Sequence, residues 1–271
     1  MNRRVPVLFF LHGGGLVGGS QSIQVSGREI YDPTNLVRTS VAQGEPLIVV
    51  TANYRVGPLG FLASAELMAD NVGGMGISSK PVGGNYGLHD QRRALEWCAR
   101  FISGFGGDPS NITLHGSSAG GVSCHYHCAF PPRREPLFRR AILSSGTFIS
   151  CRPMPLQYHQ EIFDGYVREA TRMSHFSMGP KDPVDLLRSA SVDELLASTP
   201  QGVRWTMYAD NVWIKDDMLR AYQESPEPKP DLIIGSAEYE VCSLCCRSPL
   251  ASSVPFLFSK NPLYPVTLAY D

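Results

Sequence analysis

A short strand that runs directly into a serine between two glycines constrains the fold of this chain most strongly. The segment NITLHGSSAGG, residues 111–121, passes from a β-type stretch into Gly116-x-Ser118-x-Gly120. At a sharp turn between a strand and a helix, the serine backbone is strained and its Oγ projects above the sheet. The two glycines leave room for that turn. The helix after Ser118 would point its first amides, beginning with Ala119, toward the reaction centre, where they can stabilise an oxyanion.

A second glycine motif, FLHGGGLVGG at residues 10–19, follows an apolar strand near the start of the chain. In a strand–serine–helix fold, the loop after an early strand supplies oxyanion-hole amides, and glycine lets the acyl oxygen approach the backbone. Residues 13–18 also fit the dinucleotide pattern G-x-G-x-x-G, with Glu29 or Asp32 as the ribose acid. That pattern requires a helix at the glycines, whereas residues 18–33 are polar and weakly helical. We therefore favour the oxyanion-hole interpretation.

The chain alternates between short apolar segments and longer helical ones. Strands that are apolar on both faces, as in a covered parallel sheet, are expected at residues 5–11, 46–54, 111–115, 139–145 and 231–236. Helices are expected at residues 88–105, 119–129, 156–173, 183–197 and 215–223. Residues 62–87, rich in Gly, Ser and Asn, predict a long surface loop. This alternation predicts an α/β fold with a mostly parallel sheet flanked by helices.

Composition narrows the class of partner. The 271 residues are 43% hydrophobic, and a net charge of −1 without a basic stripe argues against nucleic acid. No apolar run is long enough to span a membrane, and no signal-peptide pattern is visible. The sequence therefore does not identify the cellular compartment, and the cytoplasm is the default expectation. Cys242-x-x-Cys245 lacks a second ligand pair, which favours ordinary thiols over a zinc or redox site. We expect no metal and no cofactor.

Taken together, the motifs identify a resemblance to the type-B carboxylesterase/lipase family, which includes the cholinesterases. The matching segments, in the family's order from residue 5 to about 241, are VLFFLHGGG, VVTANYRVGPLGFL, GNYGLHDQRRALEW, FGGDPSNITLHGSSAGG, FRRAILSSG and IIGSAEYE. The hormone-sensitive-lipase group shares the HGGG and the serine turn but lacks the middle segments, so it ranks second. The resemblance implies an α/β-hydrolase fold, as a single partial domain over residues 1–271 with a helical insertion at about 152–225.

The resemblance also implies roles for individual residues. Ser118 would be the acyl-forming nucleophile, and Glu240 would be the triad acid. The oxyanion-hole amides would come from Gly14, Gly15 and Ala119. Glu238 is a nearby competitor for the acid, although the spacing from Gly235 favours Glu240; a solvated loop charge is the other interpretation of Glu240.

Two further matches look structural. Arg55 and Asp108 resemble the family's internal salt bridge. Asn111-Ile-Thr113 is formally a glycosylation sequon, but it begins a buried strand, so a structural asparagine is favoured.

The triad histidine of the family comes after the acid, yet no histidine follows Glu240. The seven histidines are His12, His89, His115, His125, His127, His159 and His175. Only four residues precede Val5, so the pattern is incomplete at both ends and a fragment is expected, marginally stable because an apolar sheet edge is exposed.

These observations together predict a serine carboxylic-ester hydrolase that forms an acyl-enzyme on Ser118. Its substrate would be a small, uncharged or apolar carboxylic ester. Activity would be impaired because a serine hydroxyl needs a base. The alternative is a non-catalytic member of the same fold that binds a partner.

Overall fold

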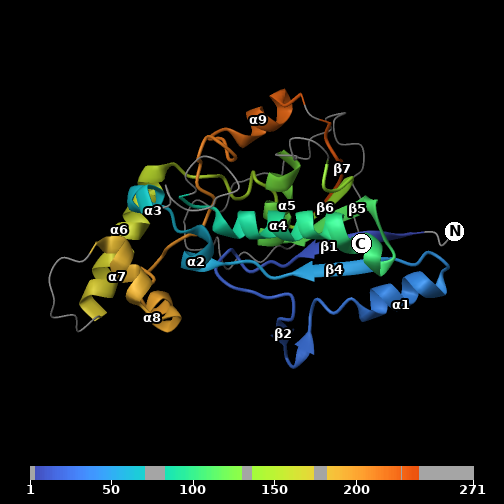
Figure 1. Cartoon of the computed structure of the whole chain (residues 1–271), viewed down its shortest axis with the longest axis horizontal. Helices are drawn as coiled ribbons and strands as arrows, with labels where there is room; N and C mark the ends of the chain where they lie inside the picture. Colours follow the sequence, from blue (N-terminus) through green and yellow to red (C-terminus); the bar gives the residue numbers. More distant parts are fainter. Residues whose placement is uncertain (1–3, 71–82, 130–135, 174–181, 227, 238–271) are drawn as a thin grey trace.

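The computed structural model describes residues 4–70, 83–129, 136–173, 182–226 and 228–237, and its centre is a five-stranded parallel sheet. The strand order is β4-β1-β5-β6-β7 (Figure 1). The strands are β1 (Val5–Leu11), β4 (Ile48–Ala52), β5 (Gly107–Ser117), β6 (Arg140–Ser144) and β7 (Asp231–Gly235). All five predicted strands are therefore confirmed, and β5 begins four residues earlier than expected. The predicted α/β class is confirmed with them.

The two faces of the sheet differ in burial. On one face the side chains of the three central strands are buried: Val7, Phe9, Leu11, Ile112, Leu114, Ala141 and Leu143. Helices α4 (Tyr86–Phe101) and α5 (Ala119–Ala129) contact these strands, and their buried side chains join the same core cluster. On the other face Phe10 is buried, but Thr113, His115 and Ile142 are only half-buried and Ile233 is exposed. Within the described residues, the prediction of a sheet covered on both faces holds for one face.

The predicted helices are present, but most of them begin or end at other residues than expected. Helix α6 (Leu156–Met173) matches its prediction, and α9 covers Met218–Glu224. Helix α4 ends at Phe101 and passes into a 3-10 turn, η2 (Ile102–Phe105), before Gly106 adopts a left-handed φ of 84°. The helix expected at 183–197 is two helices, α7 (Pro183–Ser189) and α8 (Val192–Ala197), because Ser191 caps a new helix with its side chain.

Other elements were not predicted. The hairpin of β2 (Gln24–Val25) and β3 (Arg28–Glu29) precedes α1 (Thr34–Ala42), and α2 (Gly57–Phe61) follows β4. The expected surface loop at 62–87 contains α3 (Ala65–Asp70), so that prediction was wrong for these residues; residues 71–82 lie outside the described part.

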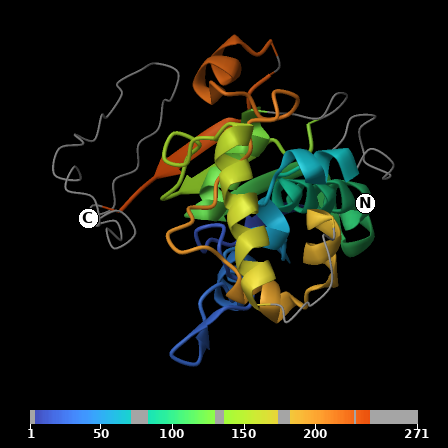
Figure 2. The same cartoon turned by 90° about the vertical axis from the view of Figure 1, so that its left-hand side faces the viewer.

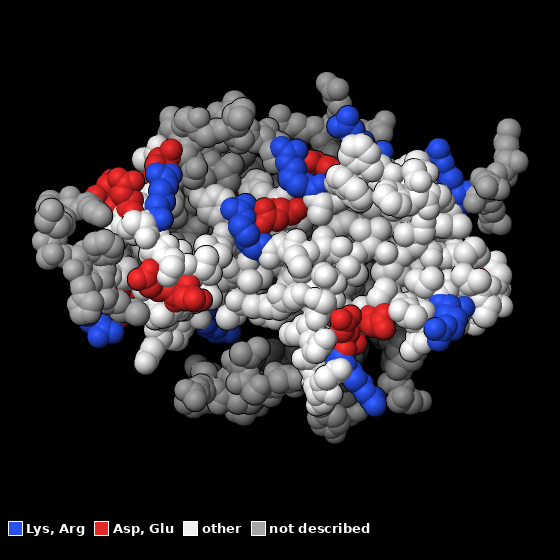
Figure 3. All heavy atoms as spheres, turned by 60° about the horizontal axis from the view of Figure 1, so that its bottom comes forward, with Lys and Arg blue, Asp and Glu red and all other residues white. Residues whose placement is uncertain are grey.

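The strands point in one direction, which defines the edge where loops converge. In Figure 1 the carboxyl ends of β1 and β4 point toward the end of the molecule that carries α2, α3 and α6. Figure 2 views that end directly, with α6 crossing in front and α9 above. No helix among the described residues is both long and apolar enough to cross a membrane. On the face in Figure 3, acidic and basic side chains are interspersed over the described residues.

Candidate active site

Ser118 occupies a strained turn between β5 and α5, as the sequence predicted. Its φ is +54°, in the left-handed region that side chains other than glycine seldom adopt. The backbone N–H of Ser118 donates to the Ser144 carbonyl on β6 at 2.7 Å, and its carbonyl accepts from Val122 N–H at 3.0 Å. These bonds hold the strained residue at the carboxyl edge of the sheet, where its side chain is exposed.

The flanking glycines allow the close approach that this turn requires. A Cβ at Gly120 would lie 2.2 Å from the Leu11 carbonyl oxygen of β1, and a Cβ at Gly116 would lie 2.3 Å from the Gly120 carbonyl oxygen. Neither distance is possible for a real side chain, because both contacts are with backbone atoms. The predicted reason for these glycines is confirmed.

The glycine loop after β1 lies directly beside Ser118. Strand β1 pairs with β5, with Leu11 opposite Gly116, so the chain leaves both strands at neighbouring points. A Cβ at Gly13 would stand 3.1 Å from the Cβ of Ser118 and 2.7 Å from the Ser117 carbonyl oxygen. Residues 15–17 form a turn, and the Val17 amide donates to the Gly14 carbonyl at 3.0 Å. Because no helix opens at these glycines, the dinucleotide interpretation fails.

Three backbone amides near Ser118 are available to a ligand. Within the described part of the chain, the N–H groups of Gly14, Gly15 and Ala119 donate no hydrogen bond. Ala119 is the first residue of α5, where an amide has no partner inside the helix. Amide donors at a helix start and in a glycine loop can stabilise negative charge on an oxygen. The arrangement suits the predicted oxyanion hole, whose role remains a prediction.

No described histidine hydrogen-bonds to Ser118. His12 lies in the glycine loop and its Nδ1 contacts the Gly13 carbonyl at 2.8 Å, while Nε2 of His115 contacts Ser144 Oγ at 3.1 Å. His125 and His127, two residues apart on α5, contact different partners, Phe148 and Gln91.

Burial keeps three of the histidines neutral. It lowers the pKa of His125 and of His127 to about 3, and that of His159 to about 4. A histidine with so low a pKa is a poor base near neutral pH.

The predicted acid cannot be located, because Glu240, its competitor Glu238 and also His175 lie outside the described residues. Strand β7 ends at Gly235, and the Gly235 carbonyl accepts from Ser145 N–H at 2.7 Å. The strand that precedes Glu240 therefore reaches the same edge as Ser118.

No group of three potential ligands could hold a metal ion among the described residues. Cys98, Cys124, Cys128 and Cys151 are free thiols, and burial raises the pKa of each, to about 11 for Cys98. Cys242 and Cys245 lie outside the described residues.

The expected ion pair between Arg55 and Asp108 is wrong. The guanidinium of Arg55 binds both carboxylate oxygens of Asp90 at 2.8 Å, and the Arg55 backbone N–H donates to Asp90 Oδ2 at 3.0 Å. Asp108 instead accepts from the N–H and the hydroxyl of Ser110. The pairing follows from α4, which presents Asp90 at the end of β4. Asn111, as predicted, has a structural partner, because its Oδ1 accepts from Arg140 at 2.8 Å.

The sequence analysis predicted no role for two residues that contact the site. A Cβ at Gly146, just after β6, would lie 2.1 Å from the Ser118 carbonyl oxygen, so this glycine also makes room for the turn. Tyr54, just after β4, donates from its hydroxyl to the His12 carbonyl at 2.6 Å. The only sequence signal for either residue was its place within a segment shared with the family, since both contacts depend on strand order.

Comparisons with known proteins agree with this geometry. A family model described as the carboxylesterase family matches residues 1–253. Lipase 4 of Diutina rugosa is 32% identical over 251 residues, which cover 87% of this chain and 42% of the lipase. Acetylcholinesterase of Gallus gallus is 44% identical over 142 residues, 52% of this chain and 16% of that protein. The chain spans about two fifths of the length of the Diutina lipase.

Solved structures show the same architecture. A carboxylesterase of Geobacillus stearothermophilus superposes with a TM-score of 0.68 at 30% identity, covering 87% of this chain and 46% of that one. A PNB esterase superposes with a TM-score of 0.67 at 28% identity, with 88% and 46% covered. The fold is therefore that of the α/β-hydrolases, as the resemblance implied.

Proposed function

Because the chain belongs to the carboxylesterase family, we propose that it hydrolyses carboxylic esters through an acyl-enzyme on Ser118. The observation that carries this proposal is the contact of the glycine loop with the serine turn, where a Cβ at Gly13 would lie 3.1 Å from the Cβ of Ser118. This contact supports the proposal that unpaired amides from two parts of the chain serve one hydroxyl. The relatives named above are hydrolases, which supports catalysis over the partner-binding alternative.

The chemistry proceeds in two steps. Ser118 Oγ attacks the ester carbonyl carbon and loses its proton, while the carbonyl π electrons move to oxygen. The amides of Gly14, Gly15 and Ala119 stabilise that oxyanion, and a donor of this kind is worth about 10²–10³ in rate. When the carbonyl re-forms, the bond to the alcohol breaks and the alcohol leaves with a proton. Water then attacks the acyl-enzyme in the same way, which releases the acid and restores the hydroxyl.

The proton from Ser118 needs an acceptor, and this limits the rate. No histidine stands between Glu240 and Asp271, and no described histidine hydrogen-bonds to Ser118. Loss of a triad member costs several orders of magnitude, because the oxyanion hole and substrate binding alone remain. We therefore propose that the 271-residue chain acylates slowly unless a base is supplied, and that Glu240 would orient such a base.

The substrate class is a small, uncharged or apolar carboxylic ester. Val17, in the turn of the glycine loop, is 60% exposed and offers an apolar surface beside the site. The names of two relatives, a lipase and a bile salt-activated lipase, support an apolar ester.

Labelling with a fluorescent organophosphonate ester, with and without added imidazole at pH 7.5, tests both parts of the proposal. We expect slow labelling that imidazole accelerates, because imidazole can accept the serine proton, and none in Ser118→Ala under either condition. Pyrazole, similar in size but far less basic, serves as the control. Wild-type protein left unlabelled even with imidazole would refute the nucleophile. Rapid labelling that imidazole leaves unchanged would refute only the impairment.

A further inference from the structure

Tyr54 contacts the glycine loop from the side opposite to Ser118. In the strand order β4-β1-β5, the loop after β1 lies between Tyr54, which follows β4, and the serine turn, which follows β5. The Tyr54 hydroxyl donates to the His12 carbonyl at 2.6 Å. Its ring also stacks on the His12 imidazole, with centroids 4.3 Å apart and planes 13° apart. Tyr54 is 7% exposed and His12 is fully buried, so water does not compete for either contact.

The peptide that Tyr54 holds lies beside the serine turn. The His12 carbonyl oxygen would lie 2.8 Å from a Cβ at Gly120, and a Cβ at Gly13 would lie 3.1 Å from that of Ser118. A peptide unit is planar, so fixing the His12 carbonyl also fixes the direction of the Gly13 N–H in the same plane. The amides of Gly14 and Gly15 come one and two residues after this fixed plane, so it is the nearest fixed point on their N-terminal side.

A run of three glycines needs such an anchor. Glycine permits close approach of a substrate oxygen, but it also leaves the backbone the greatest conformational freedom of any residue. An oxyanion hole is effective only when its donors are held in place before the reaction. The far end of the loop is held as well, because Gly57 N–H donates to the Leu16 carbonyl at 2.6 Å.

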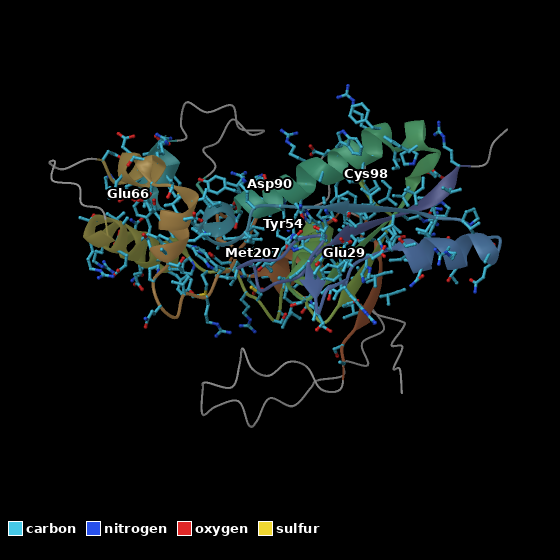
Figure 4. The ribbon with its side chains drawn as sticks, turned by 90° about the horizontal axis from the view of Figure 1, so that it is seen from below. Glu29, Tyr54, Glu66, Asp90, Cys98 and Met207 are labelled. Carbon is cyan, nitrogen blue, oxygen red and sulfur yellow. The ribbon has the colours of Figure 1, made fainter. Side chains whose placement is uncertain are left out.

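The segment that holds the loop is itself fixed. Arg55, next to Tyr54, binds Asp90 of α4 through its backbone N–H and its guanidinium, and Figure 4 shows Tyr54 and Asp90 near one another. Burial raises the pKa of Tyr54 above its ordinary value, so the phenol remains a donor at neutral and mildly alkaline pH. Burial likewise lowers the pKa of His12, which keeps its stacked ring neutral.

We propose that Tyr54 is a positioning residue, whose hydroxyl holds the His12–Gly13 peptide so that the Gly14 and Gly15 amides face the oxygen of a substrate bound at Ser118. This inference rests on the proposed function. It assigns to the residue after β4 a part in oxyanion stabilisation, although its side chain touches no reacting atom.

Tyr54→Phe tests the inference, because it keeps the stacked ring and removes only the donor. Tyr126→Phe is the matched control, since Tyr126 of α5 is also buried and its hydroxyl also donates to a backbone carbonyl, that of Cys151, at 2.8 Å. The rates to compare are imidazole-assisted kcat/KM values for an ester and for the thionoester with sulfur in place of the carbonyl oxygen. The thionoester relies less on amide donors. We expect Tyr54→Phe to slow the ester about 10- to 100-fold and the thionoester much less. Both variants should lose thermal stability to a similar extent.

A second measurement keeps the inference separate from the proposed function. Hydrogen exchange of the peptide covering residues 12–19 should be faster in Tyr54→Phe than in Tyr126→Phe, whether or not the protein turns over an ester. Equal slowing of ester and thionoester, or wild-type exchange in residues 12–19, would overturn the positioning role. Failure of the proposed function would appear differently, as wild-type protein without labelling that depends on Ser118.

Discussion

Replacing Gly120 by alanine adds one methyl group at the closest contact between α5 and the sheet. The new Cβ would lie 2.2 Å from the Leu11 carbonyl oxygen and 2.8 Å from the His12 carbonyl oxygen. The shorter distance is about 0.8 Å inside the 3.0 Å that real Cβ atoms keep. Both oxygens belong to the backbone at the end of strand β1, so neither can rotate away. The helix or the strand must shift instead.

The size of the effect follows from two opposing terms. Overpacking a well-packed site costs about 1–3 kcal/mol, and a collision with backbone belongs at the upper end. Alanine is the better helix former by about 1 kcal/mol, which offsets part of that cost. The net loss is then about 2 kcal/mol in the free energy of unfolding, or roughly 4–8 °C in Tm for a chain of this size. Because the shift occurs where the glycine loop meets Ser118, labelling by the phosphonate should fall more steeply than stability.

Gly104→Ala is the matched control. Gly104 lies in η2 with open space around its Cβ position and without a positive φ, so alanine there should leave Tm unchanged or raise it slightly. Urea unfolding of both variants, with labelling measured well below each Tm, separates loss of folding from loss of reactivity. If Gly120→Ala melted and reacted like the wild type, the close contact between α5 and β1 would be absent and our account of the turn would fail.

Other consequences can be checked on the same protein. A double-mutant cycle between Arg55 and Asp90 should give about 0.5–1 kcal/mol of coupling, since the pair is half-exposed, and a cycle between Arg55 and Asp108 should give none; the reverse would restore the original prediction. Burial, followed by the charge of a neighbouring arginine, lowers the pKa of His127 to about 3, so between pH 6.5 and 3 the unfolded chain binds a proton that the folded chain does not. As the pH is lowered through this range, the free energy of unfolding should therefore decrease by roughly 1 kcal/mol per pH unit because of this group. His127→Gln should flatten the slope of stability against pH in urea titrations, and an unchanged slope would contradict the burial. The thiol of Cys124, whose pKa burial raises well above its usual range, should resist a thiol reagent at pH 8 until urea is added, and rapid reaction in the native state would show that α5 opens.

The sequence was most informative where a structural requirement is local. The strand, the serine and the helix after it lie within about twenty residues, and each glycine there is required by a close backbone contact at the turn. The need for glycine at positions 116 and 120 therefore follows from the local pattern of residues. The five strands were predictable for a similar reason, since a buried parallel strand is a short apolar run.

The sequence was least informative where the requirement depends on which strands are neighbours. Tyr54 reaches His12 across 42 positions, and nothing in its own segment indicates that contact. The partner of Arg55 was taken from the family resemblance and was wrong, because the position of α4 brings Asp90, and not Asp108, to Arg55. Helix α3, with six residues, is shorter than the window in which helical periodicity can be recognised.

The strand order also has a consequence for folding. The chain forms β1, then β4 on one side of it, and returns much later to place β5 on the other side. Closing such loops is slow compared with local pairing, because the chain entropy is lost before the long-range contacts form. The hydroxyl of Ser118 meets its amide neighbours only once β5 has paired with β1. A reagent that reacts with this serine would therefore count the molecules in which β5 has paired, and its reaction rate during refolding would follow the arrival of that strand.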